Sequence, residues 1–579
     1  MKFLLAAFNA KYIHSNPAIY SLKAYAGEQY EPYIELGEYT INHSPDQILA
    51  DIYKRKPDVI GFSCYIWNFT LVQELLGEVH KLLPDTELWL GGPEVSFECH
   101  AILEKYPYVK GIMIGEGEET FLALLRYYLK EGELSLEDIP GLALSTGYTT
   151  ERDLVNLSQV PFLYSAGNAD KLNDFEHRII YYESSRGCPF RCSYCLSSID
   201  KKVRLRDIEL VKKELQFFLD HKVPQVKFID RTFNCNHEHA KEIWQFILNN
   251  DNSVTNFHFE IAADLLNDEE LALLSKMRPG LVQLEIGVQT TNPESLKEIR
   301  RVMDIEKLGK TVEKLQSGRN IHLHLDLIAG LPYENYESFG KSFSDVYAMK
   351  PEQLQLGFLK VLKGSFMAEK ALAYGLAYLD KAPFEVLYTN WLSFDEVRQL
   401  KEIEEMVEIY YNSNQFTHTI PLLESLFTSP FALYEALAKF YKEQGYFVQA
   451  PARSYKYQVL LDFALSVDKE REALYRESLT FDLYLRENAK SRPAFAADTE
   501  AHKAEFHAFF QDEEAVRGLL PNYEAYDLKQ ISKMTHLEWF HYPVWEIGNA
   551  NKLMKEKKVL FDYQERSALT NEAKIFVID

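Results

Sequence analysis

Hydrophobic runs alternate with amphipathic segments along the first part of the chain. Segments with helical periodicity, such as Leu71–Leu83, separate runs that are short and apolar enough to be buried strands. This alternation predicts a doubly wound parallel sheet over residues 1–140, with helices on both faces. The expected strands are Lys2–Phe8, Tyr33–Ile41, Val59–Ile66, Glu87–Pro93 and Gly111–Gly115.

A second alternating series follows residues 141–178, which are mixed in character, begin after Pro140 and are interpreted as a linker. The helical segments of this series include a long one at Pro293–Gln316. Right-handed crossovers curl such βα units into an open barrel, with its site at the carboxyl ends of the strands. We therefore predict a partial (β/α)6 barrel over residues 179–370. Its expected strands are Ile179–Ser185, Val226–Asp230, Phe257–Ala262, Val282–Val288, Ile321–Ile328 and Leu354–Val361.

Beyond the barrel the pattern becomes helical, and Tyr, Phe, Leu, Glu and Lys are frequent. The periodicity predicts helices at Phe394–Tyr410 and Pro430–Gln444, whereas Tyr455–Leu465 is compatible with a strand. We expect a mostly α-helical C-terminal domain over residues 371–579. No motif there carries chemistry, so its expected role is to shape the substrate pocket.

Composition limits the possible partners. The chain has 579 residues and a formal net charge of −23, which suits several globular domains and disfavours a phosphate-binding surface for nucleic acid. The six cysteines, half of them clustered, indicate a reducing compartment. The apolar start Met1–Lys11 is too short for a signal sequence, and no run is long enough to span a membrane. We expect a cytoplasmic protein with no membrane partner and no nucleic-acid partner.

One basic run, Lys201–Arg206, stands out against this acidic background. It is interpreted as a solvated face, with the steering of an anionic substrate as the alternative.

Cys188, Cys192 and Cys195 have the spacing C-x3-C-x2-C on one short segment. Three thiolates can bind three corners of an iron–sulfur cube and leave the fourth iron without a protein ligand. A zinc site lacking one ligand is the alternative. With these residues the chain resembles the radical S-adenosylmethionine (SAM) superfamily. The resemblance implies a 4Fe–4S cluster on these three catalytic cysteines. It also implies that SAM on the open iron is split to a 5′-deoxyadenosyl radical, with electrons from a small donor such as flavodoxin or ferredoxin.

Several polar residues interrupt the apolar strands of the expected barrel. A buried carboxylate is costly unless paired, so such residues indicate a site, or else a charge pair that holds strands together. The resemblance assigns SAM contacts to Tyr194, Asp230, Glu260, Glu285, Gln289, Asp326 and Gly330. His322 and His324 share a strand face and are interpreted as structural, with proton transfer as the alternative. Cys235 is interpreted as packing.

Glycine-rich and polar segments follow the strands of residues 1–140, where ligands bind in doubly wound sheets. Their order ahead of the cysteines resembles the flavodoxin-like cobalamin-binding domain of many radical SAM enzymes. The resemblance implies cobalamin contacts from Asn9, Tyr12, His14, Ser63, Tyr65, Trp67, Gly91, Gly92, Pro93, Glu94, Gly115, Glu116, Gly117 and Glu118. A domain that has lost its cofactor and only shields the barrel is the alternative.

The Asp-x-His-x-x-Gly signature, which supplies a histidine ligand to cobalt in cobalamin mutases, is absent from the sequence. The lower face of cobalt is therefore expected to be open or covered by a side chain. Tyr65, Trp67, Tyr12 and His14 are the candidates.

These features predict a cobalamin-dependent radical SAM enzyme, a class B methyltransferase that methylates an unactivated carbon. The alternatives are a cobalamin-assisted rearrangement or cyclisation without methyl transfer, and a non-catalytic partner that binds the cofactors. A tRNA methylthiotransferase is disfavoured, because residues 1–140 contain only Cys64 and Cys99 and the acidic tail is helical.

Overall fold

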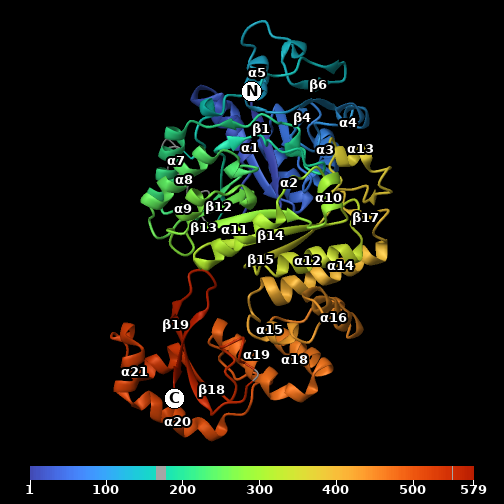
Figure 1. Ribbon diagram of the computed structural model, residues 1–579. Helices are drawn as coiled ribbons and strands as arrows, with labels where there is room; N and C mark the ends of the chain where they lie inside the picture. Colours follow the sequence, from blue (N-terminus) through green and yellow to red (C-terminus); the bar gives the residue numbers. More distant parts are fainter. Residues whose placement is uncertain (165–177, 551, 579) are drawn as a thin grey trace.

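The computed structural model describes residues 1–164, 178–550 and 552–578, so part of the predicted linker, residues 165–177, lies outside the described residues. The chain forms an N-terminal α/β domain, a central open barrel and a C-terminal domain, and these follow one another along the molecule (Figure 1). Within the described residues, no helix is both long and apolar enough to cross a membrane.

The N-terminal domain contains the predicted doubly wound sheet, with strand order β2-β1-β3-β4-β5-β6-β7. Strands β1 to β5 pair in parallel, and two groups of apolar side chains cover the two faces. Helices α1 and α5 pack on one face, and α2, α3 and α4 on the other. The elements are β1 Phe3–Asn9, α1 Pro17–Ala26, β2 Ile34–Thr40, α2 Pro45–Arg55, β3 Val59–Ser63, α3 Phe69–Leu82, β4 Glu87–Gly91, α4 Cys99–Lys105, β5 Val109–Met113 and α5 Glu118–Tyr128.

The segment interpreted as a linker begins as part of this sheet. Strands β6 (Leu142–Leu144) and β7 (Gly147–Tyr148) form an antiparallel hairpin that pairs with β5. The hairpin satisfies the backbone groups that the edge of β5 would otherwise expose.

The central domain is the predicted open barrel, a six-stranded sheet of order β15-β14-β13-β12-β11-β8 in which all neighbours are parallel. Its strands are β8 Ile180–Tyr182, β11 Gln225–Phe228, β12 Asn256–Ile261, β13 Val282–Gln289, β14 His322–Ala329 and β15 Gln353–Phe358. The helices around them are α7 Ile208–Asp220, α8 His237–Asn249, α9 Asp268–Leu274, α10 Pro293–Glu298, α11 Ile305–Ser317 and α12 Tyr336–Tyr347.

Two predicted elements of the barrel are interrupted. The first strand ends at Tyr182, and the next residues form β9 (Ser185–Arg186), which pairs with β10 (Arg204–Leu205) instead of the barrel. The prediction of one continuous helix at Pro293–Gln316 is wrong, because the chain leaves the helix between α10 and α11. There Arg300 has a left-handed φ of 57°, and the carbonyl of Ile299 accepts a hydrogen bond from Ser193 of the cysteine segment.

The C-terminal domain is mostly helical, as predicted, but it also contains an antiparallel sheet that the sequence pattern did not indicate. Its strands are β18 Thr535–Phe540, β19 Lys557–Arg566 and β20 Ala573–Ile578. The strand suggested at Tyr455–Leu465 is wrong, because this segment is helix α18, with Tyr457, Leu460 and Leu461 buried. The main helices are α14 Phe394–Val407, α15 Thr419–Glu424, α16 Pro430–Glu443, α18 Tyr455–Val467, α19 Glu472–Arg486, α20 Lys503–Gln511, α21 Glu513–Leu519 and α22 Leu528–Met534.

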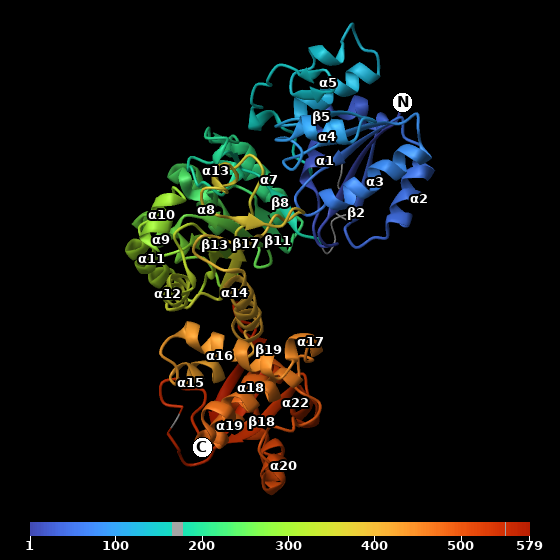
Figure 2. The ribbon, with the colours of Figure 1, turned by 90° about the vertical axis from the view of Figure 1, so that its right-hand side faces the viewer.

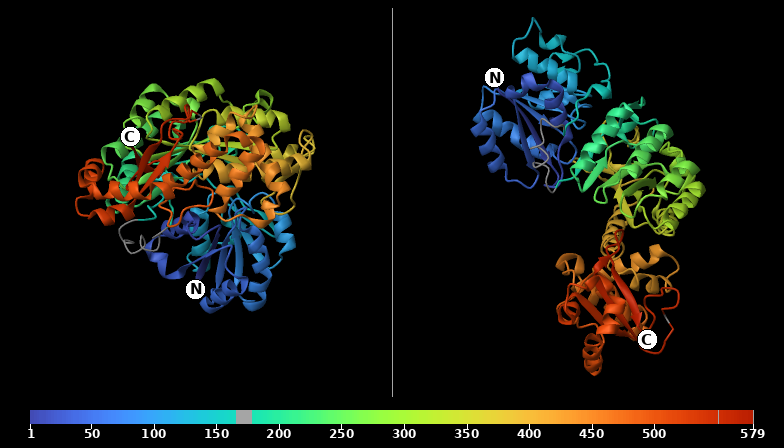
Figure 3. Two further views of the ribbon diagram at one scale, coloured as in Figure 1. Left: turned by 90° about the horizontal axis from the view of Figure 1, so that it is seen from below. Right: turned by 90° about the vertical axis from the view of Figure 1, so that its left-hand side faces the viewer.

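The C-terminal domain lies at the amino ends of the barrel strands, joined through α14 (Figure 2; Figure 3, right). The amide side chain of Asn412, beyond α14, exchanges hydrogen bonds with the backbone of Leu354 at the start of β15. The turn after β19 brings Ala568 against Gly280, just before β13. Residues 374–386 do pack near the carboxyl ends of the strands, against Ile299 and Leu331. The described part beyond α14 thus lies away from the carboxyl ends of the barrel strands, and the role expected for it in shaping the substrate pocket stays a prediction.

Candidate functional site

Three neighbouring cavities lie at the carboxyl ends of the barrel strands and at the boundary with the N-terminal domain. The cluster cavity, of about 190 Å³, is lined by all three cysteines of the C-x3-C-x2-C segment. The interdomain cavity, of about 620 Å³, is lined by residues of both domains, among them Trp67 and Tyr181. The cofactor cavity, of about 1290 Å³, is lined by the loops that follow the strands of the N-terminal sheet.

The cysteine segment is held in a fixed loop by its backbone. The β9–β10 pair closes the base of the loop, and the N–H of Cys188 donates to the carbonyl of Asp200 over 3.0 Å. Gly187 has φ +95°, and a Cβ there would lie 2.5 Å from the carbonyl of Lys202, so only glycine fits. The N–H of Cys195 in turn donates to the carbonyl of Cys192. The loop therefore presents its three thiols to one cavity.

The environment of these thiols fits an iron–sulfur cluster. Burial raises the pKa of Cys188, and the neighbouring Cys195 and Cys192 raise it further, because three thiolates repel one another. A cationic cluster removes this repulsion. Arg301 Nη1 lies 3.7 Å from Cys192 Sγ and adds positive charge. Among the described residues, no three Cys, His, Asp or Glu side chains are arranged to hold a single metal ion. In a cubane each thiolate instead binds a different iron.

Polar side chains of β11, β12, β13 and β14 face the interior of the barrel. Lys227 Nζ lies 3.0 Å from the carboxylate of Glu285, and His258 Nε2 lies 2.9 Å from it. Burial by itself raises the pKa of Glu285, but His258 and Lys227 more than offset this and lower it to about 2. Asp326 lies 3.0 Å from His324 Nε2. Glu285 and Asp326 thus belong to charge pairs of the kind that the alternative interpretation described. Both side chains also line the cluster cavity.

Most of the residues assigned to SAM line the cluster cavity. They are Tyr194, Glu260, Glu285, Gln289 and Asp326. Two assigned residues do not. The carboxylate of Asp230 is fully buried and accepts hydrogen bonds from the Ser184 N–H and from the hydroxyls of Ser184 and Ser185. Gly330, with φ +91°, packs against Val386. The structure therefore does not support a SAM contact for the side chain of Asp230 or for Gly330.

Sequence reasoning missed two arginines of this cavity, Arg231 and Arg301. Arg301 donates to the carbonyl of Gly287 and to Tyr194 Oη over 3.4 Å. Arg231 directly follows the predicted strand Val226–Asp230, and Arg301 lies within the predicted helix Pro293–Gln316, so their sequence context did not separate them from surface residues.

The residues assigned to cobalamin gather around the other two cavities. Ser63, Tyr65, Gly91, Gly92, Pro93, Gly115, Glu116, Gly117 and Glu118 line the cofactor cavity. Asn9, His14, Tyr65, Trp67 and Glu116 line the interdomain cavity. Gly92 has φ +112°, and a Cβ there would lie 2.4 Å from the carbonyl of Cys64. This glycine thus permits the close backbone approach that the loop needs.

Two assigned residues line none of the three cavities. The ring of the exposed Tyr12 lies under the Arg178 guanidinium, 4.8 Å from its carbon. Glu94 is buried and lies 3.6 Å from Lys363 of the barrel. The structure therefore does not support a cobalamin contact for the side chain of either residue.

Of the residues considered for the lower face of cobalt, three line the interdomain cavity. The rings of Tyr65 and Trp67 are stacked, with centroids 4.4 Å apart. His14 Nδ1 lies 2.6 Å from the hydroxyl of Tyr181, and burial lowers the pKa of this histidine. His14 therefore links the two domains.

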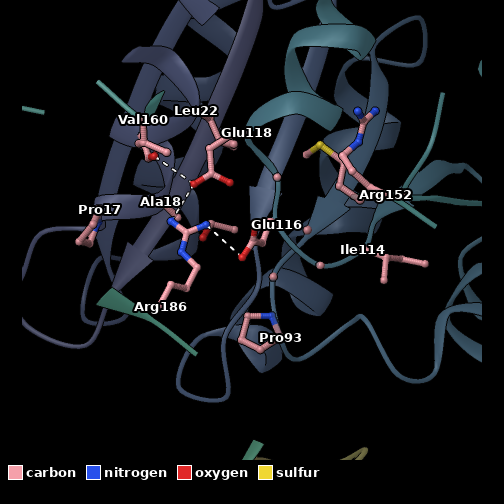
Figure 4. A pocket seen from close by; sticks show the side chains of 18 of the residues that line it. Pro17, Ala18, Leu22, Pro93, Ile114, Glu116, Glu118, Arg152, Val160 and Arg186 are labelled. Atoms are coloured by element: carbon pink, nitrogen blue, oxygen red, sulfur yellow. Dashed lines mark hydrogen bonds and ion pairs between the residues drawn. The ribbon is translucent and has the colours of Figure 1, made fainter. Parts of the chain in front are cut away.

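Ion pairs join the cysteine loop to the N-terminal domain. Arg186 lies 2.9 Å from Glu118 and 3.4 Å from Glu116 (Figure 4). It also lies 2.7 Å from Glu183, which precedes the cysteine loop. Arg204 pairs with Glu116 as well. This arrangement fixes the cysteine loop relative to the loops of the N-terminal sheet.

The basic run is only partly solvated. The half-buried Arg204 and the buried Arg206 form ion pairs with Glu116 and Glu214, whereas Lys201 and Lys202 are exposed. The two arginines are therefore structural. For these two residues, both the solvated face and the steering of an anionic substrate are wrong.

The remaining reactive side chains lie away from the cavities. Cys235 lines none of the three, and burial raises its pKa to about 11. Burial also lowers the pKa of His322 to about 4, so this histidine stays neutral at physiological pH.

Three family models match successive parts of the chain. Residues 4–125 match the B12 binding domain, residues 182–346 match the radical SAM superfamily, and residues 372–561 match a protein family of unknown function, DUF4080. The chain contains a B12-binding domain followed by a radical SAM domain. The cofactors predicted from the sequence, a 4Fe–4S cluster, SAM and cobalamin, are those of these two domains.

Curated relatives include cobalamin-dependent radical SAM methyltransferases. The chain is 27% identical over 369 residues to "Cobalamin-dependent radical SAM methyltransferase TokK" from Streptomyces tokunonensis, an alignment that covers 58% of this chain and 52% of TokK. The match thus spans about half the length of that relative.

Solved structures share the fold. The cobalamin-dependent radical SAM enzyme OxsB, with aqua-cobalamin bound, has a TM-score of 0.56 at 17% identity. The match covers 90% of this chain and 81% of the OxsB chain. The radical SAM methyltransferase TsrM from Kitasatospora setae, with cobalamin and a [4Fe-4S] cluster bound, has a TM-score of 0.55 at 18% identity, covering 66% of this chain and 76% of its own.

Proposed function

We propose that this protein is a cobalamin-dependent methyltransferase of class B, which transfers a methyl group to an unactivated carbon of its substrate. The observation that carries the proposal is that the three cavities adjoin one another. The cluster cavity and the interdomain cavity share the lining residues Ser197, Arg231 and Glu260. The interdomain and cofactor cavities share others, including Tyr65 and Glu183. A substrate placed at this junction is within reach of both cofactor sites.

Together the bound cofactors supply a 5′-deoxyadenosyl radical and a transferable methyl group. The chain supplies the binding and the geometry. Cys188, Cys192 and Cys195 would hold the cluster. Tyr194 and Arg301 line the cluster cavity beside these cysteines. The backbone at Gly92 leaves room for the cobalamin. Burial of the junction between two domains excludes water, which protects a radical from side reactions.

The relatives support methyl transfer, because TokK is described as a methyltransferase. We also propose that a small electron donor, such as flavodoxin or ferredoxin, reduces the cluster. No substrate follows from the matches, since they span about half of the relative's length.

The test is anaerobic reconstitution followed by turnover with methyl-labelled SAM and a small-molecule extract. The proposal predicts 5′-deoxyadenosine together with label in a product. Formation of 5′-deoxyadenosine without transfer of label, under conditions in which substrate is consumed, would contradict methyl transfer and favour a rearrangement or cyclisation.

A further inference from the structure

The wall between the cluster cavity and the interdomain cavity consists of few residues. Ser197, Arg231 and Glu260 are the residues that line both. The three cysteines lie on one side of this wall, and Asn9, Tyr65 and Trp67 of the N-terminal domain lie on the other. A molecule that reacts with groups bound on both sides has to contact this wall.

Nearly all charged side chains around the two cavities already have partners. Arg186 is surrounded by three carboxylates, and Asp200 pairs with Arg204 over 2.9 Å. Glu285 pairs with Lys227. Apart from the wall, the lining therefore holds more acidic than basic side chains, and its cations already have partners.

Arg231 is the exception among the cations. It is exposed to the cavities, and within the part of the chain that the structure describes its guanidinium makes no hydrogen bond and no ion pair. Its backbone is well fixed, because it follows Asp230, whose carboxylate is anchored by Ser184 and Ser185. Arg231 lines the interdomain cavity together with Tyr65 and Glu260. Its charge opposes the rise in pKa that burial causes in both residues.

A ligand that fills this space removes the water around Arg231. A guanidinium without water needs an anionic or hydrogen-bonding partner, because an unpaired buried charge costs several kcal/mol. Arginine is suited to this, since its planar fork binds carboxylate or phosphate through two parallel hydrogen bonds.

The carboxylate of SAM is not the natural partner of Arg231. SAM binds at the cluster, and Arg301 is the arginine placed there, with Nη1 3.7 Å from Cys192 Sγ. Arg231 also lines the interdomain cavity, together with Tyr65 of the N-terminal domain, whereas Arg301 lines the cluster cavity alone. It is therefore available for the molecule between the two cofactor sites.

Building on the proposed function, we propose that the substrate carries a carboxylate or a phosphate, that Arg231 binds this anionic group at the wall between the two cavities, and that Arg231 thereby determines specificity. Glu260, the acidic member of the wall, opposes an anion on its own side and so directs the anionic group towards Tyr65.

The test uses the full chain reconstituted with cluster, cobalamin and SAM, without reductant, so that no turnover occurs. Inorganic phosphate and acetate are titrated separately by calorimetry. We expect saturable binding of at least one anion by the unaltered protein, and the stronger of the two indicates which group the substrate carries. Arg231→Gln is expected to weaken binding about tenfold or more, since a charge-assisted hydrogen bond is lost. Arg231→Lys, which keeps the charge without the fork, is expected to bind with intermediate affinity.

Two further variants make the result specific. Burial raises the pKa of Glu260 to about 7, so the variants are compared at pH 8, where the carboxylate is charged. Glu260→Gln removes this repulsive charge, so anion binding is expected to become tighter. Arg319→Gln is the matched control, because Arg319 is also exposed but lies outside the cysteine segment and lines none of the three cavities. The affinity of this control variant for phosphate and acetate is expected to equal that of the unaltered protein.

The proposal is overturned if neither anion binds the unaltered protein, or if Arg231→Gln binds the anion as well as Arg319→Gln does. Cluster absorbance in each variant reports that the barrel is folded. Because the titration involves no turnover, its outcome is independent of methyl transfer. Failure of the proposed function appears instead as absent label transfer by the unaltered protein.

Discussion

The guanidinium of Arg186 lies 2.9 Å from the carboxylate of Glu118 and joins the two halves of the site. Arg186 comes two residues before Cys188, and Glu118 begins helix α5 of the N-terminal domain. The side chain of Glu118 is 7% exposed and that of Arg186 21%, so water screens their attraction only in part. The loop that presents the cysteines is thus held against the loops that line the cofactor cavity.

Replacing Arg186 with Gln is expected to loosen this junction while the cysteines stay in place. Methyl transfer from labelled SAM should fall about tenfold, because charge-assisted hydrogen bonds between the domains are lost. Formation of 5′-deoxyadenosine should fall less. The control is Lys81→Gln, which breaks an exposed pair of the same 2.9 Å length with Glu78 on helix α3. Equal losses of both activities in Arg186→Gln would show that the contact serves the barrel alone.

Gly92 and Gly115 offer a matched pair in the cofactor loops. Both have positive φ, +112° and +74°, but a Cβ at Gly92 would lie 2.4 Å from the carbonyl of Cys64, whereas a Cβ at Gly115 meets no atom within 4 Å. Gly115→Ala should cost only the backbone strain of about 1–2 kcal/mol. Gly92→Ala adds a steric clash and should abolish cobalamin binding, measured by titration of cobalamin absorbance. Equal cobalamin affinity in the two variants would contradict the role given to the Gly92 backbone.

Glu334 provides a pH-dependent contribution to stability. Its carboxyl group accepts hydrogen bonds from Thr290 and Ser342, and burial raises its pKa from 4.5 to about 7. The folded state therefore keeps a proton that the unfolded state loses above its lower pKa. This contribution is complete below about pH 4.5 and is lost as the pH rises to about 7.

Glu334→Gln cannot lose a proton, so its free energy of unfolding should rise relative to the unaltered protein across this window. The difference should reach about 3 kcal/mol, from 1.36 kcal/mol per pKa unit. Denaturant unfolding at a series of pH values measures it. The exposed Glu313→Gln on helix α11 should show no such change. A constant difference between Glu334→Gln and the unaltered protein would contradict the raised pKa.

Local patterns in the sequence predicted most of the fold. The strands of both sheets follow from short apolar runs, because a strand buried on both faces is apolar at nearly every position. The failures depend on distant contacts. Helix Pro293–Gln316 is interrupted where Ile299 binds Ser193 of the cysteine loop. The C-terminal sheet pairs β19 with β18 and β20, and no local pattern marked this pairing.

In the site, too, local patterns could be predicted and distant contacts could not. The cysteines could be predicted because their spacing within one loop determines the chemistry. Asp230 could not be assigned correctly, since the serines that satisfy it come from the end of β8. Arg301 was missed because only the folded barrel brings it beside Cys192. Arg231 was missed because only the folded barrel brings it into one cavity with Glu260.

The most direct test of the account is the Cys192→Ala variant, reconstituted anaerobically beside the unaltered protein and Cys235→Ala. Spin resonance of the reduced samples and 5′-deoxyadenosine formation are measured on all three. We predict a 4Fe–4S signal and SAM cleavage in the unaltered protein and in Cys235→Ala, and neither in Cys192→Ala, which should still bind cobalamin. SAM cleavage by Cys192→Ala at the unaltered rate, or zinc in place of iron in the unaltered protein, would contradict the account.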